Sequence, residues 1–223
     1  MPIDAVLVGA RGTGSANTAT TTGGTTAASG STFLICVSWD EASYGSITTV
    51  GDNKGNTYTA LGTPQTDAGV PNCFTQLFVV ENGAGGAGHT ATFTTSGNSF
   101  PTVHLIEITG ATTAPLDKIA QVRDTATPFT VTSPTLSQAD EVVVCICAEN
   151  SSSVSYVSSN FTILSQETDA VQFWTSAVGK LVVSSTSAVT PNWTRGAGGS
   201  AGLALATFKA QASIPDIMGQ AML

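Results

Sequence analysis

The second half of the chain repeats the pattern of the first half, and this self-similarity constrains the fold more than any single motif does. Residues 141–150, EVVVCICAEN, match 32–41, TFLICVSWDE, and the match aligns Cys145 with Cys36. Similar matches link 155–165 to 46–61 (placing Phe161 where Tyr58 lies), 170–184 to 73–88, and 202–210 to 102–110. We therefore expect one domain over residues 1–212, with pseudo-repeats at about 18–110 and 125–210. Two separate domains, joined like beads on a string, are the alternative.

The amino-acid content favours strands over helices. Charged residues make up only 10% of the 223-residue chain, so it is poor in the Glu, Lys and Arg that fill helices. Apolar and β-branched runs instead alternate with turns rich in Gly, Pro, Asn and Ser, which is typical of a sandwich or barrel. The run 32–39 is apolar throughout, which predicts a central strand with both faces buried. The expected fold class is all-β, a jelly-roll-like or immunoglobulin-like β-sandwich with an internal pseudo-repeat.

Residues 46–61, SITTVGDNKGNTYTAL, hold the clearest turn signal in the chain. Two alternating runs flank Gly-Asp-Asn-Lys-Gly-Asn, residues that tolerate the left-handed backbone of a tight reversal, so the stretch predicts a β-hairpin. The oxygens of Asp52, Asn53 and Asn56 are also of the kind that bind calcium. The spacing of an EF-hand is missing and Lys54 intervenes, so we expect a turn in which Asx side chains bond to their own backbone, and no metal site.

Charge and hydropathy narrow the possible partners and compartments. The net charge is −8, and the seven basic residues are scattered along the chain, so we expect no nucleic-acid binding. No apolar stretch has the length of a membrane span, and Asp4 stands where a signal peptide carries positive charge. We therefore expect no membrane association, and we expect the protein to be made and kept in a cytoplasm.

Candidate catalytic residues are few. The histidines, His89 and His104, stand in no Ser/His/Asp or HExxH motif, and packed histidines are expected. The carboxylate pairs Asp40-Glu41 and Asp140-Glu141 fall at the ends of strands that match in the repeat. A glycosidase would need two carboxyl groups facing each other across a cleft. We expect no enzymatic activity and no cofactor.

Cysteine and tryptophan residues mark expected core positions. Cys36, Cys73, Cys145 and Cys147 lie within apolar runs, so buried thiols are expected in place of a disulfide framework. Cys145 and Cys147 share one strand face and could ligate a metal, but no second pair or histidine accompanies them. Trp193, between Asn192 and Thr194, is the candidate for an exposed sugar-stacking platform, with core packing as the default.

The last residues, QASIPDIMGQAML, break the strand pattern. Pro215 and Gly219 argue against a core strand or a long helix. The apolar residues of segment 213–223 are the candidate partner-binding residues, namely Ile214, Ile217, Met218, Met222 and Leu223. Docking on the chain's own domain, docking on a partner, and disorder are the three alternatives for this tail.

Three motifs, GDNKGNTYTALG, QLFVVENGAGGAGHTATFT and VHLIEITGATTAPLD, give residues 3–210 a family resemblance. The chain resembles a recurrent family of β-sandwich domains carried by bacteriophage structural proteins and some bacterial surface proteins. The resemblance implies a virion protein without catalytic residues, similar to capsid decoration or cement proteins, which lie on the outer shell and are often homotrimers. The implied partners are the major capsid protein and further copies of the chain. A carbohydrate-binding or host-attachment module, which would take a surface glycan, and a glycosidase or depolymerase are the alternatives.

Overall fold

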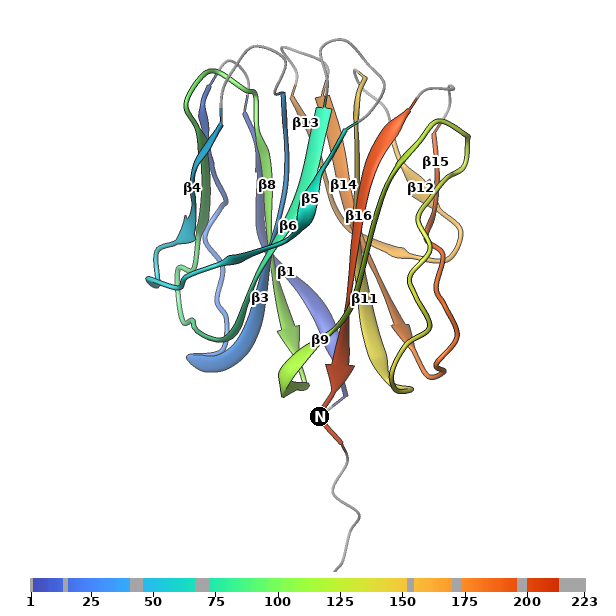
Figure 1. Cartoon of the computed structure of the whole chain (residues 1–223). Coiled ribbons are helices and arrows are strands. Elements are labelled where there is room, and N and C mark those ends of the chain that lie inside the picture. The colour runs from blue at the N-terminus through green and yellow to red at the C-terminus, as the bar shows by residue number, and fades with distance from the viewer. Residues whose placement is uncertain are drawn as a thin grey trace, which may run out of the picture.

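The computed structural model describes residues 2–13, 16–40, 46–66, 73–151, 155–169, 174–195 and 200–212. All regular structure in these residues is β (Figure 1). The first half contains β1 (Asp4–Gly12), β2 (Thr18–Thr20), β3 (Ser29–Asp40), β4 (Ile47–Asp52), β5 (Thr59–Thr66), β6 (Cys73–Ala84), β7 (Ala91–Thr95) and β8 (Thr102–Thr109). The second half contains β9 (Ala111–Asp124), β10 (Phe129–Thr130), β11 (Glu141–Asn150), β12 (Val157–Ser158), β13 (Thr162–Asp169), β14 (Trp174–Val183), β15 (Asn192–Thr194) and β16 (Ala201–Ala210). The predicted all-β class is confirmed.

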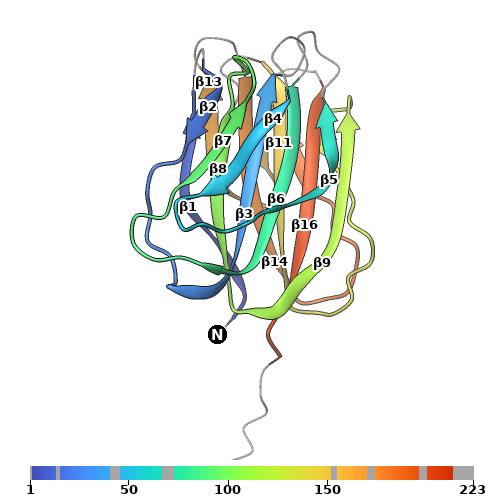
Figure 2. The same ribbon diagram turned by 60° about the vertical axis from the view of Figure 1, so that its left-hand side comes forward.

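The strands form four antiparallel sheets stacked as layers (Figures 1 and 2). Each half supplies a five-stranded inner sheet, ordered β1-β8-β3-β6-β5 or β9-β16-β11-β14-β13, and a three-stranded outer sheet, ordered β2-β7-β4 or β10-β15-β12. Within the first half, β1 pairs with β8, β2 with β7 and β3 with β6, a nested order of the kind found in eight-stranded jelly rolls. The second half has the same order, so strand n of the first half corresponds to strand n + 8.

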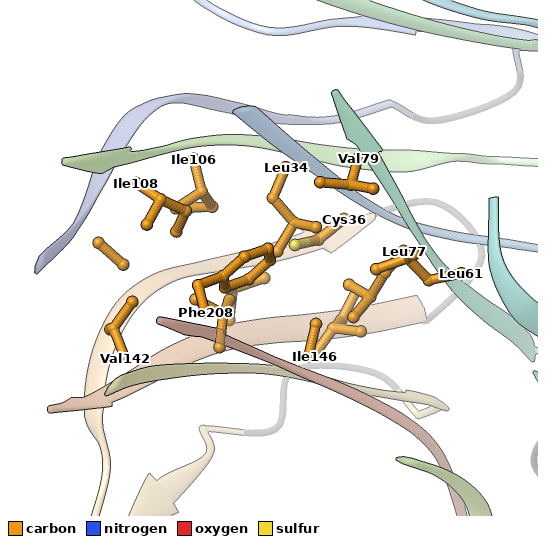
Figure 3. Close-up of a cluster of buried hydrophobic side chains, with 14 of the residues drawn as sticks. Leu34, Cys36, Leu61, Leu77, Val79, Ile106, Ile108, Val142, Ile146 and Phe208 are labelled. Atoms are coloured by element: carbon orange, nitrogen blue, oxygen red, sulfur yellow. The ribbon is translucent and has the colours of Figure 1, made fainter. Parts of the chain in front are cut away.

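Three apolar cores separate the four layers. Leu34 and Cys36 of β3 point into the central core between the two inner sheets, where Phe208 and Ile146 meet them (Figure 3). The alternate residues of β3, such as Phe33, point toward the outer sheet of the same half. This double burial explains why residues 33–37 are apolar without interruption. In addition to the core that the halves share, each half encloses one of its own.

The direction of the side chains corrects the alignment of the two halves. Cys36 of β3 and Ile146 of β11 point into the central core. Cys145 of β11 points into the core of the second half instead. The sequence match of Cys36 with Cys145 is therefore wrong, because it joins residues that face different cores. Neighbouring positions of a strand with two buried faces are equally apolar, so the sequence pattern does not separate them.

The hairpin predicted for residues 46–61 is also wrong. β4 pairs with β7 in the outer sheet, whereas β5 pairs with β6 in the inner sheet. The turn between them therefore carries the chain from one layer to the next. Turn residues signal a change of direction, but they do not indicate whether the flanking strands pair.

The two inner sheets face each other through an approximate twofold arrangement. β1 of the first half lies along β13 of the second. Their counterparts are β9 and β5, and these two strands also lie along each other. Gly12 N–H donates to Glu167 Oε2 at 3.1 Å on one side. On the other, Gln121 Nε2 donates to Leu61 O at 3.0 Å, where β5 and β9 run side by side (Figure 2). The contact of β1 with β13 is therefore equivalent to the contact of β9 with β5, as in the interface of a symmetric dimer.

Candidate functional site

Asp52 organises the corner between β4 and β5. Its Oδ1 accepts the backbone N–H groups of Lys54 at 3.0 Å and Asn56 at 3.1 Å. Its Oδ2 accepts Asn56 Nδ2 at 2.6 Å and the Tyr58 hydroxyl at 2.8 Å. The Asx hydrogen bonding predicted for this loop is therefore present, and both carboxylate oxygens that a calcium ion would need already receive protein donors.

His89 extends this corner into a buried chain of polar groups. Its Nε2 lies 2.9 Å from Asp52 Oδ2, and its Nδ1 lies 3.1 Å from the Thr26 hydroxyl. The order Asp, His, Thr matches that of a nucleophilic triad. However, His89 is completely buried, and the Thr26 oxygen also accepts the Gly86 N–H at 2.9 Å. The chain of hydrogen bonds thus fixes three loops against one another.

The ionisation of the corner follows from these contacts. Burial opposes the charge on Asp52, but hydrogen bonds from Asn56, His89 and Tyr58 outweigh burial and lower the pKa of Asp52 below its ordinary value. Burial raises the pKa of Tyr58, and the hydrogen bond and charge of Asp52 raise it further. Asp52 is therefore an ionised acceptor and Tyr58 a neutral donor at neutral pH.

Two asparagines clamp the corner onto the glycine-rich loop after β6. Asn53 Nδ2 donates to Gly88 O at 2.7 Å, and its Oδ1 accepts the Thr90 N–H at 3.0 Å. Asn56 makes the same two-bond contact with the backbone of Ala84, at 2.8 Å in each direction. Each amide thus satisfies one backbone donor and one acceptor, as a strand partner would. The motif residues of this loop act on their own chain.

The second half repeats the asparagine clamp. Asn160 Nδ2 donates to Thr190 O at 2.8 Å, and Asn160 Oδ1 accepts the Asn192 N–H at 3.2 Å. Asn160 follows β12 as Asn53 follows β4, so the clamps are equivalent. The sequence matches did not reveal this pair, because the loops around the two asparagines differ in length and composition.

A buried polar seam joins the two halves at one end of the central core. Ser38 and Thr102 share a hydrogen bond of 2.6 Å, and Thr102 and Ser176 share one of 2.7 Å. His104 Nε2 lies 2.9 Å from Ser176 Oγ. Burial lowers the pKa of His104 from 6.5 to about 3, so it is neutral at neutral pH. This Ser/His pair has no exposed surface, and within the described residues His104 Nδ1 has no hydrogen-bond partner to orient the ring.

The expected carboxylate pairs do not lie at matching strand ends. Asp40 ends β3, whereas Glu141 begins β11, and Glu41 lies outside the described residues. Asp40 is the last residue of β3, and the last residue of the matching strand β11 is Asn150, whereas Asp140 precedes the first residue of β11.

Glu141 instead meets Asp117 of β9. Asp117 Oδ2 accepts the Ser137 N–H at 2.7 Å, and Asp117 lies near enough for its charge to act on Glu141. Burial raises the pKa of Glu141, and the neighbouring charge of Asp117 adds to that effect. The hydrogen bonds of Ser137 lower the pKa of Asp117 despite its burial. Glu141 is completely buried, whereas a glycosidase needs both carboxyl groups to face a cleft. No local pattern signals this pair, since β9 and β11 meet through β16.

The four cysteine side chains and the side chains of Trp39 and Trp193 are buried. All four cysteines are free and buried, and burial raises the pKa of Cys145 to about 12. Cys145 and Cys147 share one face of β11, as predicted. Among the described residues, no three His, Cys, Asp or Glu side chains gather as metal ligands do. Trp193 is fully buried between Tyr156 and Phe161, so the proposed sugar-stacking platform is wrong for this residue.

The candidate partner-binding residues lie outside the described residues, namely Ile214, Ile217, Met218, Met222 and Leu223. The chain that leads to them is well anchored. Ala210 N–H donates to Asp140 O at 2.9 Å, and Gln211 N–H donates to Gly110 O at 2.9 Å. The N-terminus and the end of β16 lie at the same end of the molecule, here called the base (Figure 1).

Among the described residues, no helix has the length and apolar character needed to cross a bilayer. Neither a family model, nor a curated protein, nor a solved structure matches this chain.

Proposed function

We propose that the protein is a structural component of a bacteriophage virion, a decoration or cement protein that binds the head shell and stabilises it. Its partners in this proposal are the major capsid protein and further copies of itself, and it lies on the capsid surface after assembly in the host cytoplasm. The observation that carries the proposal is the direction of the motif side chains. Asp52, Asn53 and Asn56 all bond to their own chain.

Internal bonding of this kind suits a load-bearing block. The corner clamps tie outer sheets to inner sheets, and the Ser176 seam ties one half to the other. Asp52 and His89 form the buried part of this network, where a donor that separates from its acceptor loses its partner inside a low dielectric, and the fold is rigid there for that reason. A cement protein must keep its shape while many modest contacts act together across a lattice.

The base offers a place for attachment. The first and last described residues lie there, and the exposed residues Gln211 and Ala212 precede the apolar segment 213–223 in the sequence. Apolar side chains that become buried in a contact contribute about 1.5 to 3 kcal/mol each. Five such side chains in one short segment would therefore supply much of the energy of an attachment.

The decisive experiment mixes the purified protein with phage heads that lack it and measures co-sedimentation. We expect saturable binding of the full chain and much weaker binding after deletion of residues 213–223. The thermal transition of the deleted form should stay close to that of the full chain, because residues 1–212 hold the cores. A loss of fold stability as large as the loss of binding would show that the tail belongs to the body.

The same assay includes host polysaccharide as a second ligand. The rival interpretation, a carbohydrate-binding or host-attachment module, predicts retention on polysaccharide and none on heads. That result would overturn the cement proposal. Release of reducing sugar would favour the glycosidase alternative, for which an Asp117→Asn variant would be the first test.

A further inference from the structure

β4 is an edge strand with an open side. It pairs with β7, and among the described residues no strand lies on its other side in the outer sheet. Its first five residues, Ile47 to Gly51, carry no charge, and the carboxylate of Asp52 is turned into the corner described above. Figure 2 looks onto this outer sheet, with β4 lying over the inner sheet. An edge of this kind presents backbone groups that another strand can pair with.

The other seven edge strands of the described sheets each have a protective feature. Charges or prolines interrupt the edges of the inner sheets: Arg11 in β1, Pro64 in β5, Pro115 and Lys118 in β9, and Glu167 in β13. The remaining outer edges are short, with three residues in β2 and two each in β10 and β12. Charge, proline and short length are the devices that keep natural edges from pairing. β4 has six residues and no proline, and its one charged side chain, Asp52, is turned into the corner.

The backbone groups of β4 that face outward can be assigned from its ladder. Asn53 N–H donates to Thr90 O at 3.1 Å in continuation of the pairing with β7. Residues of an antiparallel strand turn their N–H and C=O groups alternately toward and away from a neighbour. Gly51 and Thr49 therefore face β7, whereas Val50 and Asp52 turn theirs outward. A bulge at Thr48 ends the regular part of the strand, so the open edge is centred on Val50.

We infer that β4 pairs antiparallel with β4 of a second copy of the chain, with a twofold axis beside Val50. The two three-stranded outer sheets then become one continuous sheet. A second copy fits because the edge is its own complement: each Val50 supplies one donor and one acceptor to the other. Each chain carries a net charge of −8, so two copies repel each other over most of their surfaces, and the neutral β4 edge is where approach costs least.

The test is the mass of the full-length protein in solution, measured by sedimentation across a wide range of concentration. We expect a reversible dimer. Thr49 is exposed, and in the dimer the two copies of Thr49 lie diagonally across the new strand pair. Thr49→Lys places two like charges there and should weaken the dimer at least about tenfold. The matched control is Thr20→Lys, which adds the same charge to the same face at the opposite edge strand, β2, and should leave the dimer unchanged.

Three results would overturn the inference: a monomer at every concentration, a trimer, or equal weakening by both lysine variants. Unfolding midpoints of the two variants should match, which separates loss of pairing from loss of folding. The inference also stands apart from the proposed function. A wild-type dimer that fails to bind heads would refute the cement proposal and leave the β4 pairing intact. A monomeric Thr49→Lys protein that still binds heads would show that attachment does not need the pairing.

Discussion

The polar side chains described above mainly form hydrogen bonds within the chain, and Asp52 is the clearest case. One carboxylate receives donors from Lys54, Asn56, Tyr58 and His89. Hydrogen bonds to a charged acceptor contribute more than neutral ones, and a buried donor that loses its acceptor carries its full desolvation cost. The side chain at position 52 should therefore matter more for stability than its place in a turn suggests.

The substitution Asp52→Asn tests this argument, because it replaces one carboxylate oxygen by an NH₂ group. The amide keeps the shape of the carboxylate but presents an NH₂ group to donors, so we expect a loss of about 2 to 3 kcal/mol in the free energy of unfolding by urea. Asp140→Asn is the matched control, since Asp140 is exposed and its positive φ of 58° suits asparagine equally well. Similar losses in both variants would contradict the role given to Asp52.

At the scale of elements, the sequence predicts which segments are buried strands better than it predicts which strands pair. The strand class, the double burial of residues 32–39 and the internal repeat follow from periodicity, because side-chain burial is written directly into the apolar pattern. The apolar pattern does not specify which strands pair. The sequence therefore predicts a hairpin of β4 and β5, whereas these strands lie in different layers. The Asp117–Glu141 contact and the His104 seam depend on strands far apart in sequence, which no local pattern could place together.

The equivalence of the two corner clamps gives an element-scale prediction. Asn53→Ala and Asn160→Ala each remove a side-chain amide. One backbone carbonyl and one backbone N–H of the facing loop then lose their hydrogen-bond partner. Each change should lower the free energy of unfolding by about 1 to 2 kcal/mol, and the losses should add in the double variant because the clamps lie in different halves. Equilibrium denaturation of the three variants measures this. If only one asparagine matters, the clamps are alike in geometry but not in energy.

At the scale of the whole molecule, the two halves meet through a core that is apolar along most of its length and polar at one end. The apolar part, around Leu34, Ile146 and Phe208, gives cohesion without direction. The seam of Ser38, Thr102, His104 and Ser176 fixes how the halves face each other. Since His104 is the titratable group of this seam, the stability of the contact between the halves should depend on pH.

The sign of that dependence follows from the pKa of His104. Its value of about 3 in the folded protein lies below the ordinary 6.5, so between these pH values the unfolded chain binds a proton that the folded protein does not. The stability that His104 contributes is therefore complete above about pH 6.5 and is lost as the pH falls toward 3, by on the order of 3 to 5 kcal/mol.

His104→Asn isolates this contribution, because asparagine can still donate a hydrogen bond to Ser176 but does not titrate. We expect the free energy of unfolding of the wild type to fall more steeply than that of the variant between pH 6.5 and 4, measured by urea denaturation at each pH. Carboxylates elsewhere titrate in both proteins and cancel in the difference. If the two proteins lose stability equally between pH 6.5 and 4, protonation of other groups causes the loss, and His104 does not make the contact between the halves depend on pH.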